Sequence, residues 1–163
     1  MSSTSTRPAA GGAPSQVDVR GPRFAAWVTT AVLIATLLVA GVSEPVAAVL
    51  LGAQALVFAV GAAGGPRTHP YGRLFAAVIA PRLGPVTERE PVAPLKFAQL
   101  VGLVFAVVGT VGFASGIYAL GLTATAFALV AAFLNAAFGI CLGCQIYPLV
   151  ARLRRPASAT QPA

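Results

Sequence analysis

Charge is the property that this sequence has least of. Only 9% of its 163 residues are charged, whereas soluble domains usually carry about 25%. Hydrophobic residues make up 57% of the chain, and its mean hydropathy is +0.83. This composition excludes an ordinary soluble domain and predicts an integral membrane protein that is surrounded by the lipid bilayer.

Cysteine and histidine are also scarce, which limits metal and haem chemistry. The chain has two cysteines, Cys141 and Cys144, and one histidine, His69. No histidine follows the cysteine pair directly, so covalent haem attachment is excluded. Two cysteines and one histidine fall short of a four-ligand metal site. We therefore expect no metal and no cofactor, and the sequence leaves open whether the protein is an enzyme.

Lysine is almost absent, because Lys96 is the only lysine among eleven basic residues. The formal net charge is nevertheless +7, and an excess of basic residues is common in proteins that bind nucleic acid. Here the basic residues flank apolar segments instead of forming one cluster. The pattern therefore predicts no nucleic acid partner.

The sequence contains several long apolar runs. Four of them lack charged residues and approach the roughly 20 residues that a transmembrane helix needs. In lipid the backbone must satisfy its own hydrogen bonds, so these runs are predicted to be helices. Because short turns join the first two and the last two, the predicted fold class is all-α, with four transmembrane helices in two antiparallel hairpins. The predicted spans are residues 24–42, 45–63, 97–120 and 122–142.

All eleven basic residues lie on one side of this predicted topology. Three precede the first span, five lie in the loop 64–96, and three follow the fourth span. The turn between the first two spans holds Glu44 and no basic residue. The positive-inside rule then predicts a multi-pass protein of the cell membrane, with both termini and the loop 64–96 in the cytoplasm.

The segments outside the spans differ in composition from one another. Residues 1–20 and 156–163 are rich in small residues and proline, which predicts disordered tails around a transmembrane domain of residues 21–155. The first apolar run is longer than the core of a signal peptide, so we expect no cleavage there. In the loop 64–96, apolar residues recur with helical spacing from Tyr71 to Ile79. This spacing predicts a short interfacial helix, ended by Pro81.

The two cysteines form a C-x-x-C pair at the predicted end of the fourth span. A spacing of three residues places both sulfur atoms on one helix face. A helix C-terminus is unfavourable for a thiolate, but Gly143 and Pro148 predict a loosened turn in which the sulfur atoms can meet. Two interpretations stay open: the pair carries out redox or sulfur chemistry, or it consists of two small apolar side chains inside a helix.

Several polar and small residues are candidates for helix contacts. Gln54 and Asn135 fall in the middle of predicted spans, where side-chain amides usually bond to another helix. His69 is expected to lie exposed in a loop and to be structural, and no acid or base within a span indicates a proton relay. Small residues are spaced so that helices can approach closely; they are Gly109, Gly112 and Gly116 in the third span, and Ala132, Ala136, Gly139 and Gly143 in the fourth.

Two stretches, "THPYGRLFAAVIAPRLGPVTEREPVAPLKFAQLVGLVF" and "FLNAAFGICLGCQIY", carry a resemblance to a known family. They resemble small, mainly actinobacterial membrane proteins that share a domain of unknown function (four-three-nine-five), and the resemblance covers nearly all of residues 20–155. The family has no established activity. Its members tend to occur beside thioredoxin-like and rhodanese-like proteins, which implies thiol or sulfur handling. The residues that match its signature are Pro81, Arg82, Gly84, Pro85, Phe97, Gln99, Asn135, Phe138, Gly139, Cys141, Gly143 and Cys144.

The preferred hypothesis is a membrane thiol-redox or sulfur-relay protein. Cys141 and Cys144 would accept electrons or a sulfane sulfur from a soluble thioredoxin-like or sulfurtransferase partner in the cytoplasm. One alternative is a non-catalytic scaffold or accessory subunit in an oligomer or a larger membrane complex. Another is a transporter of a small sulfur compound. The further candidate site residues are Asn135, Gly139, Gly143, Arg82, Gln99 and His69.

Overall fold

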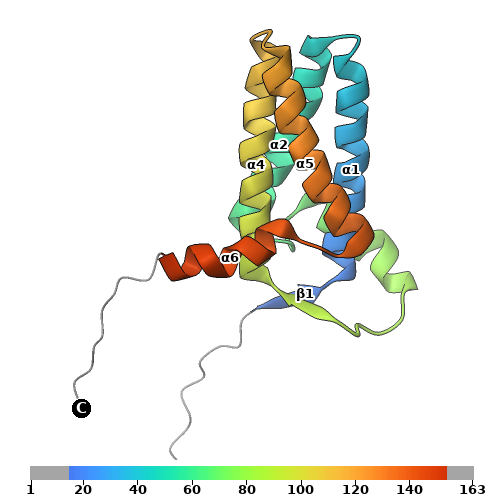
Figure 1. Cartoon of the computed structure of the whole chain (residues 1–163). Coiled ribbons are helices and arrows are strands. Elements are labelled where there is room, and N and C mark those ends of the chain that lie inside the picture. The colour runs from blue at the N-terminus through green and yellow to red at the C-terminus, as the bar shows by residue number, and fades with distance from the viewer. Residues whose placement is uncertain (1–14, 154–163) are drawn as a thin grey trace, which may run out of the picture.

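Four long helices form an antiparallel bundle in the computed structural model of this protein, which describes residues 15–153 (Figure 1). They are α1 (Arg20–Ala40), α2 (Glu44–Gly64), α4 (Val92–Ala114) and α5 (Tyr118–Phe138). Each is apolar enough and long enough to cross a membrane. The structure therefore confirms the all-α fold with four candidate spans in two hairpins.

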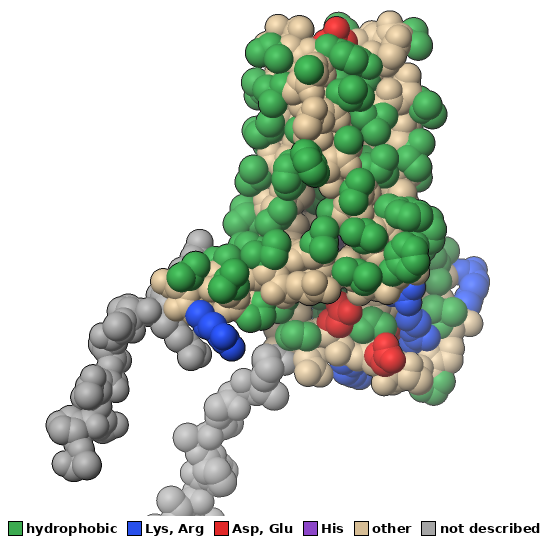
Figure 2. All heavy atoms as spheres, viewed as in Figure 1, with side chains coloured by type: hydrophobic (Ala, Val, Ile, Leu, Met, Phe, Trp, Pro, Cys, Tyr) green, Lys and Arg blue, Asp and Glu red, His purple; other side chains and the backbone are tan. Residues whose placement is uncertain are grey.

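The two hairpins pack side by side. Helix α2 lies against α4 and helix α1 against α5, so each helix of the bundle touches two others. Small side chains dominate the interior, including Ala47 and Ala106, around a few larger ones such as Leu33 and Leu51. Large apolar side chains instead cover the outside of all four helices, as lipid contact requires (Figure 2).

The α4–α5 hairpin turns earlier than the sequence indicates. The turn lies at residues 115–117, and not near 120–122, because Gly116 takes a positive φ of 75° that favours glycine. Gly116 is thus a turn residue, and its predicted role in a GxxxG contact is wrong. Gly112 does sit at the predicted close approach, since a Cβ there would lie 2.8 Å from the Cα of Gly121.

One end of the bundle carries all the remaining structure. Two short strands, β1 (Gln16–Asp18) and β2 (Arg89–Pro91), pair antiparallel there, with Val17 opposite Glu90. The predicted disordered tail 1–20 therefore ends in a strand and the start of α1. Residues 1–14 and 154–163, which include the tail predicted at 156–163, lie outside the described residues. The basic side chains gather at this same end (Figure 2), which we call the basic end.

The loop between α2 and α4 contains the predicted interfacial segment. It comprises α3 (Pro70–Leu74), a π-helical turn η1 (Phe75–Ile79) and a 3₁₀ turn η2 (Ala80–Arg82). Phe75 is buried beside Phe24 of α1, and this contact ties the segment to the bundle. The helical run ends just after Pro81, close to the position that the sequence predicts.

A sixth helix, α6 (Leu142–Leu153), lies across the basic end instead of extending α5 (Figure 1). Its apolar side chains Leu142, Ile146, Leu149 and Leu153 are exposed. This arrangement is typical of a helix that lies in the membrane interface. The predicted fourth span includes residues up to 142, so the sequence predicts no separate helix at this position.

Candidate functional site

The turn that holds the two cysteines begins where α5 ends. Gly139 adopts the left-handed conformation, with φ 70°, and its N–H donates to the carbonyl of Asn135. Such a glycine commonly ends a helix and redirects the chain. Cys141 consequently lies just before the first residue of α6. The prediction that the pair sits at a helix C-terminus is therefore wrong. The pair lies at a helix N-terminus, where the helix dipole favours a thiolate and does not oppose it.

The sulfur atoms of Cys141 and Cys144 lie at disulfide-bonding distance, and their Cα atoms are 5.2 Å apart. The N–H of Gln145 donates to the carbonyl of Cys141 (3.1 Å), which is the first backbone bond of α6. The N–H of Cys144 points at the sulfur of Cys141 (3.3 Å). Cys141 thus occupies the capping position of α6, where free N–H groups and the helix dipole stabilise a thiolate.

Pro148 does not break the helix as the sequence predicts, because α6 continues through it to Leu153. Proline has no N–H, so the carbonyl of Cys144 receives no bond from the residue four positions later. The loosened turn that lets the sulfur atoms meet is formed by Gly139 and the residues after it. This turn therefore precedes the cysteines, whereas the predicted break at Pro148 follows them.

Helix α6 is seated on α4 through its second residue. A Cβ at Gly143 would lie 2.6 Å from the Cα and 2.7 Å from the Cβ of Ala98, so the two backbones touch. Beside this contact the rings of Phe97 and Tyr147 have centroids 5.9 Å apart. A neighbouring helix therefore packs directly on the cysteine turn, and this contact fixes the turn against the bundle.

Arg23 of α1 binds the end of α5. Its Nη2 donates to the carbonyls of Ala136 and Ala137, both at 3.4 Å. A guanidinium is favourable at a helix C-terminus, where carbonyls lack partners. Asn135 lies in this last turn of α5, near the basic end, and not in mid-span as predicted. No local pattern indicates the contact between Arg23 and α5, because Ala136 lies 113 positions after Arg23.

A cavity of about 240 Å³ opens beside the cysteine turn. It lies between helices of both hairpins, and the start of α6 contributes to its lining. Cys141 lines it together with the side-chain amides of Asn135 and Gln99. Most other lining residues are apolar, among them the aromatic side chains of Phe58, Phe105 and Phe127. We call this space the cysteine cavity.

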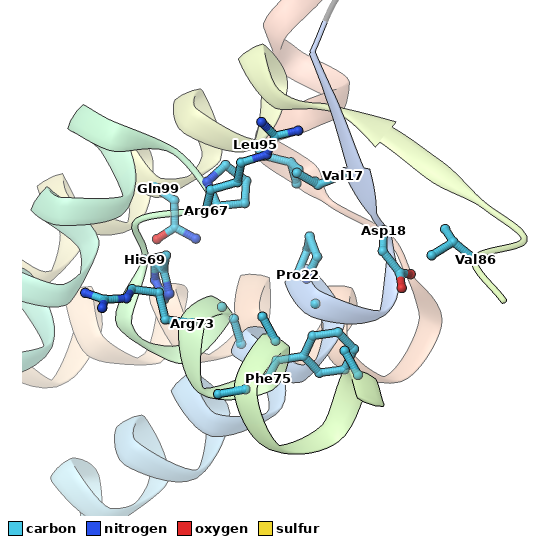
Figure 3. A pocket seen from close by; sticks show the side chains of 17 residues that line it. Val17, Asp18, Pro22, Arg67, His69, Arg73, Phe75, Val86, Leu95 and Gln99 are labelled. Atoms are coloured by element: carbon cyan, nitrogen blue, oxygen red, sulfur yellow. The ribbon is translucent and has the colours of Figure 1, made fainter. Parts of the chain in front are cut away.

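A second cavity of about 650 Å³ lies between the start of α1 and the interfacial segment (Figure 3). His69 lines it and is only 2% exposed, so the expectation of an exposed loop histidine is wrong. Neither ring nitrogen of His69 has an aligned hydrogen-bond partner. Burial lowers the pKa of His69, and the adjacent Gln99 amide opposes that shift. Burial therefore favours the neutral ring, which has one donor and one acceptor nitrogen.

Gln99 joins the two cavities because its side chain lines both. It lies next to His69 (Figure 3), and both side chains pack against Gly61. The Oε1 atom of Gln99 is buried without an aligned donor.

Gln54 is a second side-chain amide, in the middle of the bundle. Its Oε1 accepts a hydrogen bond from the hydroxyl of Tyr71 at 2.8 Å. Gln54 therefore bonds to the interfacial segment and not to another spanning helix.

Asp18, Arg20 and Arg82 lie at the basic end but do not line the cysteine cavity. Arg20 and Asp18 form an ion pair at 2.8 Å, and the hydrogen bond from Arg20 lowers the pKa of Asp18. Arg82 is exposed and donates to the carbonyl of Val78. Arg82 lines neither cavity, so the structure does not bring this candidate residue to the cysteines.

The comparisons with known proteins give a family and no activity. Residues 17–152 match the family model described as "Domain of unknown function (DUF4395)". The chain belongs to this family. Neither the curated proteins nor the solved structures yielded a match. The DUF4395 match spans the cysteine turn, both cavities and all four long helices, so the site described here lies wholly within the family's domain.

The site also contains features that sequence reasoning missed. Residues 15–153 hold no group of three or more His, Cys, Asp or Glu side chains arranged to bind a metal ion. The helix α6 had a usable signal, because a glycine after an apolar helical run commonly marks its end. No local sequence pattern predicts the burial of His69, because this burial depends on how the loop between α2 and α4 folds back against α1.

Proposed function

We propose that this membrane protein exchanges electrons with thiols and disulfides through Cys141 and Cys144. The observation that carries the proposal is the position of the pair: both sulfur atoms are within bonding distance, at the N-terminus of a helix, on a partly exposed turn. Low-pKa reactive cysteines occur in such places, whereas structural cysteines are usually buried and inert.

The exchange follows from the geometry of the turn. In the reduced pair, the thiolate of Cys141 attacks a disulfide of a partner protein, and one partner sulfur leaves as a thiolate. Cys144 then attacks the sulfur of Cys141, and the mixed disulfide breaks. The products are the Cys141–Cys144 disulfide and a partner dithiol, so two electrons and two protons pass to the partner. The reaction runs in reverse with a reduced partner.

The proposed partner is a soluble thioredoxin-like or sulfurtransferase protein on the side of the basic end. The cysteine turn lies at this end of the bundle, together with the basic side chains (Figures 1 and 2). By the positive-inside rule this side is the cytoplasm. An acidic docking surface on the partner would complement the arginines and increase the rate of encounter. The same thiolate of Cys141 would accept a sulfane sulfur from a persulfide.

Trapping of the mixed disulfide tests the proposal. Native membranes carrying Cys144→Ser are incubated with oxidised thioredoxin, and disulfide-linked products are separated without reductant. Cys144→Ser should accumulate a mixed disulfide, because the resolving thiol is missing, while Cys141→Ser should accumulate far less. In the wild type, rapid alkylation should label both cysteines after reduction. Cysteines that react only after denaturation would favour the packing role and a scaffold function.

A further inference from the structure

The cysteine cavity reaches Cys141 from the space between the spanning helices. A relay that only exchanged with one soluble partner would come to equilibrium and stop, so net turnover needs a second electron carrier. Cys141 touches two environments, the turn at the basic end and the cavity between the helices. Phe127 lines this cavity and is also exposed on the outside of α5, so we expect a ligand that is dissolved in the bilayer to reach it.

The walls of the cavity fit a planar ring with polar edges. Phe58, Phe105 and Phe127 supply aromatic faces from three different helices. Gln99 and Asn135 supply two side-chain amides. The Oε1 atom of Gln99 lies beside His69 at Gly61, and His69 is its available donor, so Gln99 offers a ligand its amide N–H groups. The cysteine cavity has a volume of about 240 Å³. This exceeds the roughly 150 Å³ of an apolar cavity that holds benzene, which leaves room for a substituted ring.

We propose that the cysteine cavity binds the ring of a lipid-soluble quinone, which oxidises the reduced Cys141–Cys144 pair. The inference rests on the proposed thiol exchange and names its second substrate. A quinone has two carbonyl oxygens for amide N–H donors, and the quinol has hydroxyl groups for an amide oxygen. It dissolves in the bilayer, and it takes up two electrons with two protons, the same number that a dithiol releases.

The reaction balances without any other reactant. The thiolate of Cys141 attacks a ring carbon, a C–S bond forms, and one oxygen takes up a proton. The thiolate of Cys144 then attacks the sulfur of Cys141, so the S–S bond forms and the C–S bond breaks. The electron pair stays on the ring, and the second oxygen takes up a proton. One dithiol and one quinone give one disulfide and one quinol.

The experiment uses the full chain in detergent, reduced and freed of reductant. The probe is a fully substituted benzoquinone that carries a ten-carbon chain. Quinol formation is followed by ultraviolet absorbance, and free thiols are counted by alkylation and mass spectrometry. We expect one quinol per cysteine pair, and none when both cysteines are replaced by serine. Exchange with oxidised thioredoxin is measured on the same samples.

A filling variant tests whether the cavity is the site. Ala132 lines the cavity on α5, whereas Ala119 of the same helix is exposed near the opposite turn. Ala132→Leu should slow quinol formation at least tenfold, while Ala119→Leu should not change it. Both should keep exchange with thioredoxin, which also shows that the variants are folded.

The other possible results each contradict one part of the proposal: the cavity, the quinone or the thiol exchange. Equal quinol formation by Ala132→Leu and the wild type would overturn the cavity as the site, because free thiols then react with quinone in solution. Absence of quinol together with intact thioredoxin exchange would overturn the quinone and leave the proposed function standing. Absence of both reactions would overturn both proposals.

Discussion

Gly143 is the residue whose replacement should most directly disturb the cysteine turn. In Gly143→Ala, the new Cβ would lie 2.6 Å from the Cα and 2.7 Å from the Cβ of Ala98. Carbon atoms prefer separations of about 3.5–4.0 Å, so α6 must move away from α4 by about 1 Å. Because Cys144 follows Gly143 directly, this movement also displaces the cysteine pair.

The size of the effect follows from two opposing terms. Overpacking a close contact costs about 1–3 kcal/mol. Alanine in a helix gains about 0.5–1 kcal/mol over glycine. The clash involves backbone atoms, which cannot rotate away, so we expect the cost to exceed the gain by about 1 kcal/mol. For a domain of this length, that difference lowers the midpoint of thermal unfolding by about 2–4 °C.

Thermal unfolding in detergent, with alkylation rates of the reduced cysteines, measures both consequences. Gly84→Ala is the matched control, because nothing lies within 4 Å of a Cβ there. A double variant with Ala98→Gly should regain part of the loss, since it removes one of the two clashing atoms. If Gly143→Ala matches Gly84→Ala in both midpoint and labelling rate, the seating of α6 on α4 does not hold the turn.

Three further predictions concern the bundle, the buried histidine and the topology. Gly112→Leu should lower the midpoint of thermal aggregation in detergent more than Leu103→Phe, because a side chain at Gly112 meets the backbone of Gly121; equal midpoints would contradict this packing role. Since burial lowers the pKa of His69, the unfolded chain takes up the proton first on acidification, so stability should fall below about pH 6.5; His69→Gln should flatten this fall in pH-dependent melting curves. A reporter that is active only outside the cytoplasm should give no signal when fused to the C-terminus, and a strong signal would place the cysteines on the oxidising side.

The number, type and pairing of the long helices were predictable because lipid leaves few choices. A run of about 20 apolar residues has to become a helix, and turns as short as the one before Glu44 force antiparallel neighbours. The ends of the helices were less predictable. The run of apolar residues from 97 to 142 contains no charge, so only the backbone conformation of Gly116 and Gly139 decides where the chain turns.

The sequence singles out the cysteine pair of the candidate site but does not predict the geometry around it. The C-x-x-C spacing identified Cys141 and Cys144, and the structure brings them together. Their position relative to a helix end depends on Gly139, and placing that one turn differently exchanges an unfavourable helix C-terminus for a favourable N-terminus. The two cavities arise from contacts between residues far apart in the chain, and no local pattern encodes such contacts.

One short stretch of α4 links the cysteine turn to both cavities. Ala98 carries the seat of α6 at Gly143, and the next residue, Gln99, lines both cavities and lies beside His69. A ligand that moves the Gln99 side chain therefore acts on the helix that positions the cysteines. The cysteine turn and the polar wall of both cavities thus meet at one turn of α4.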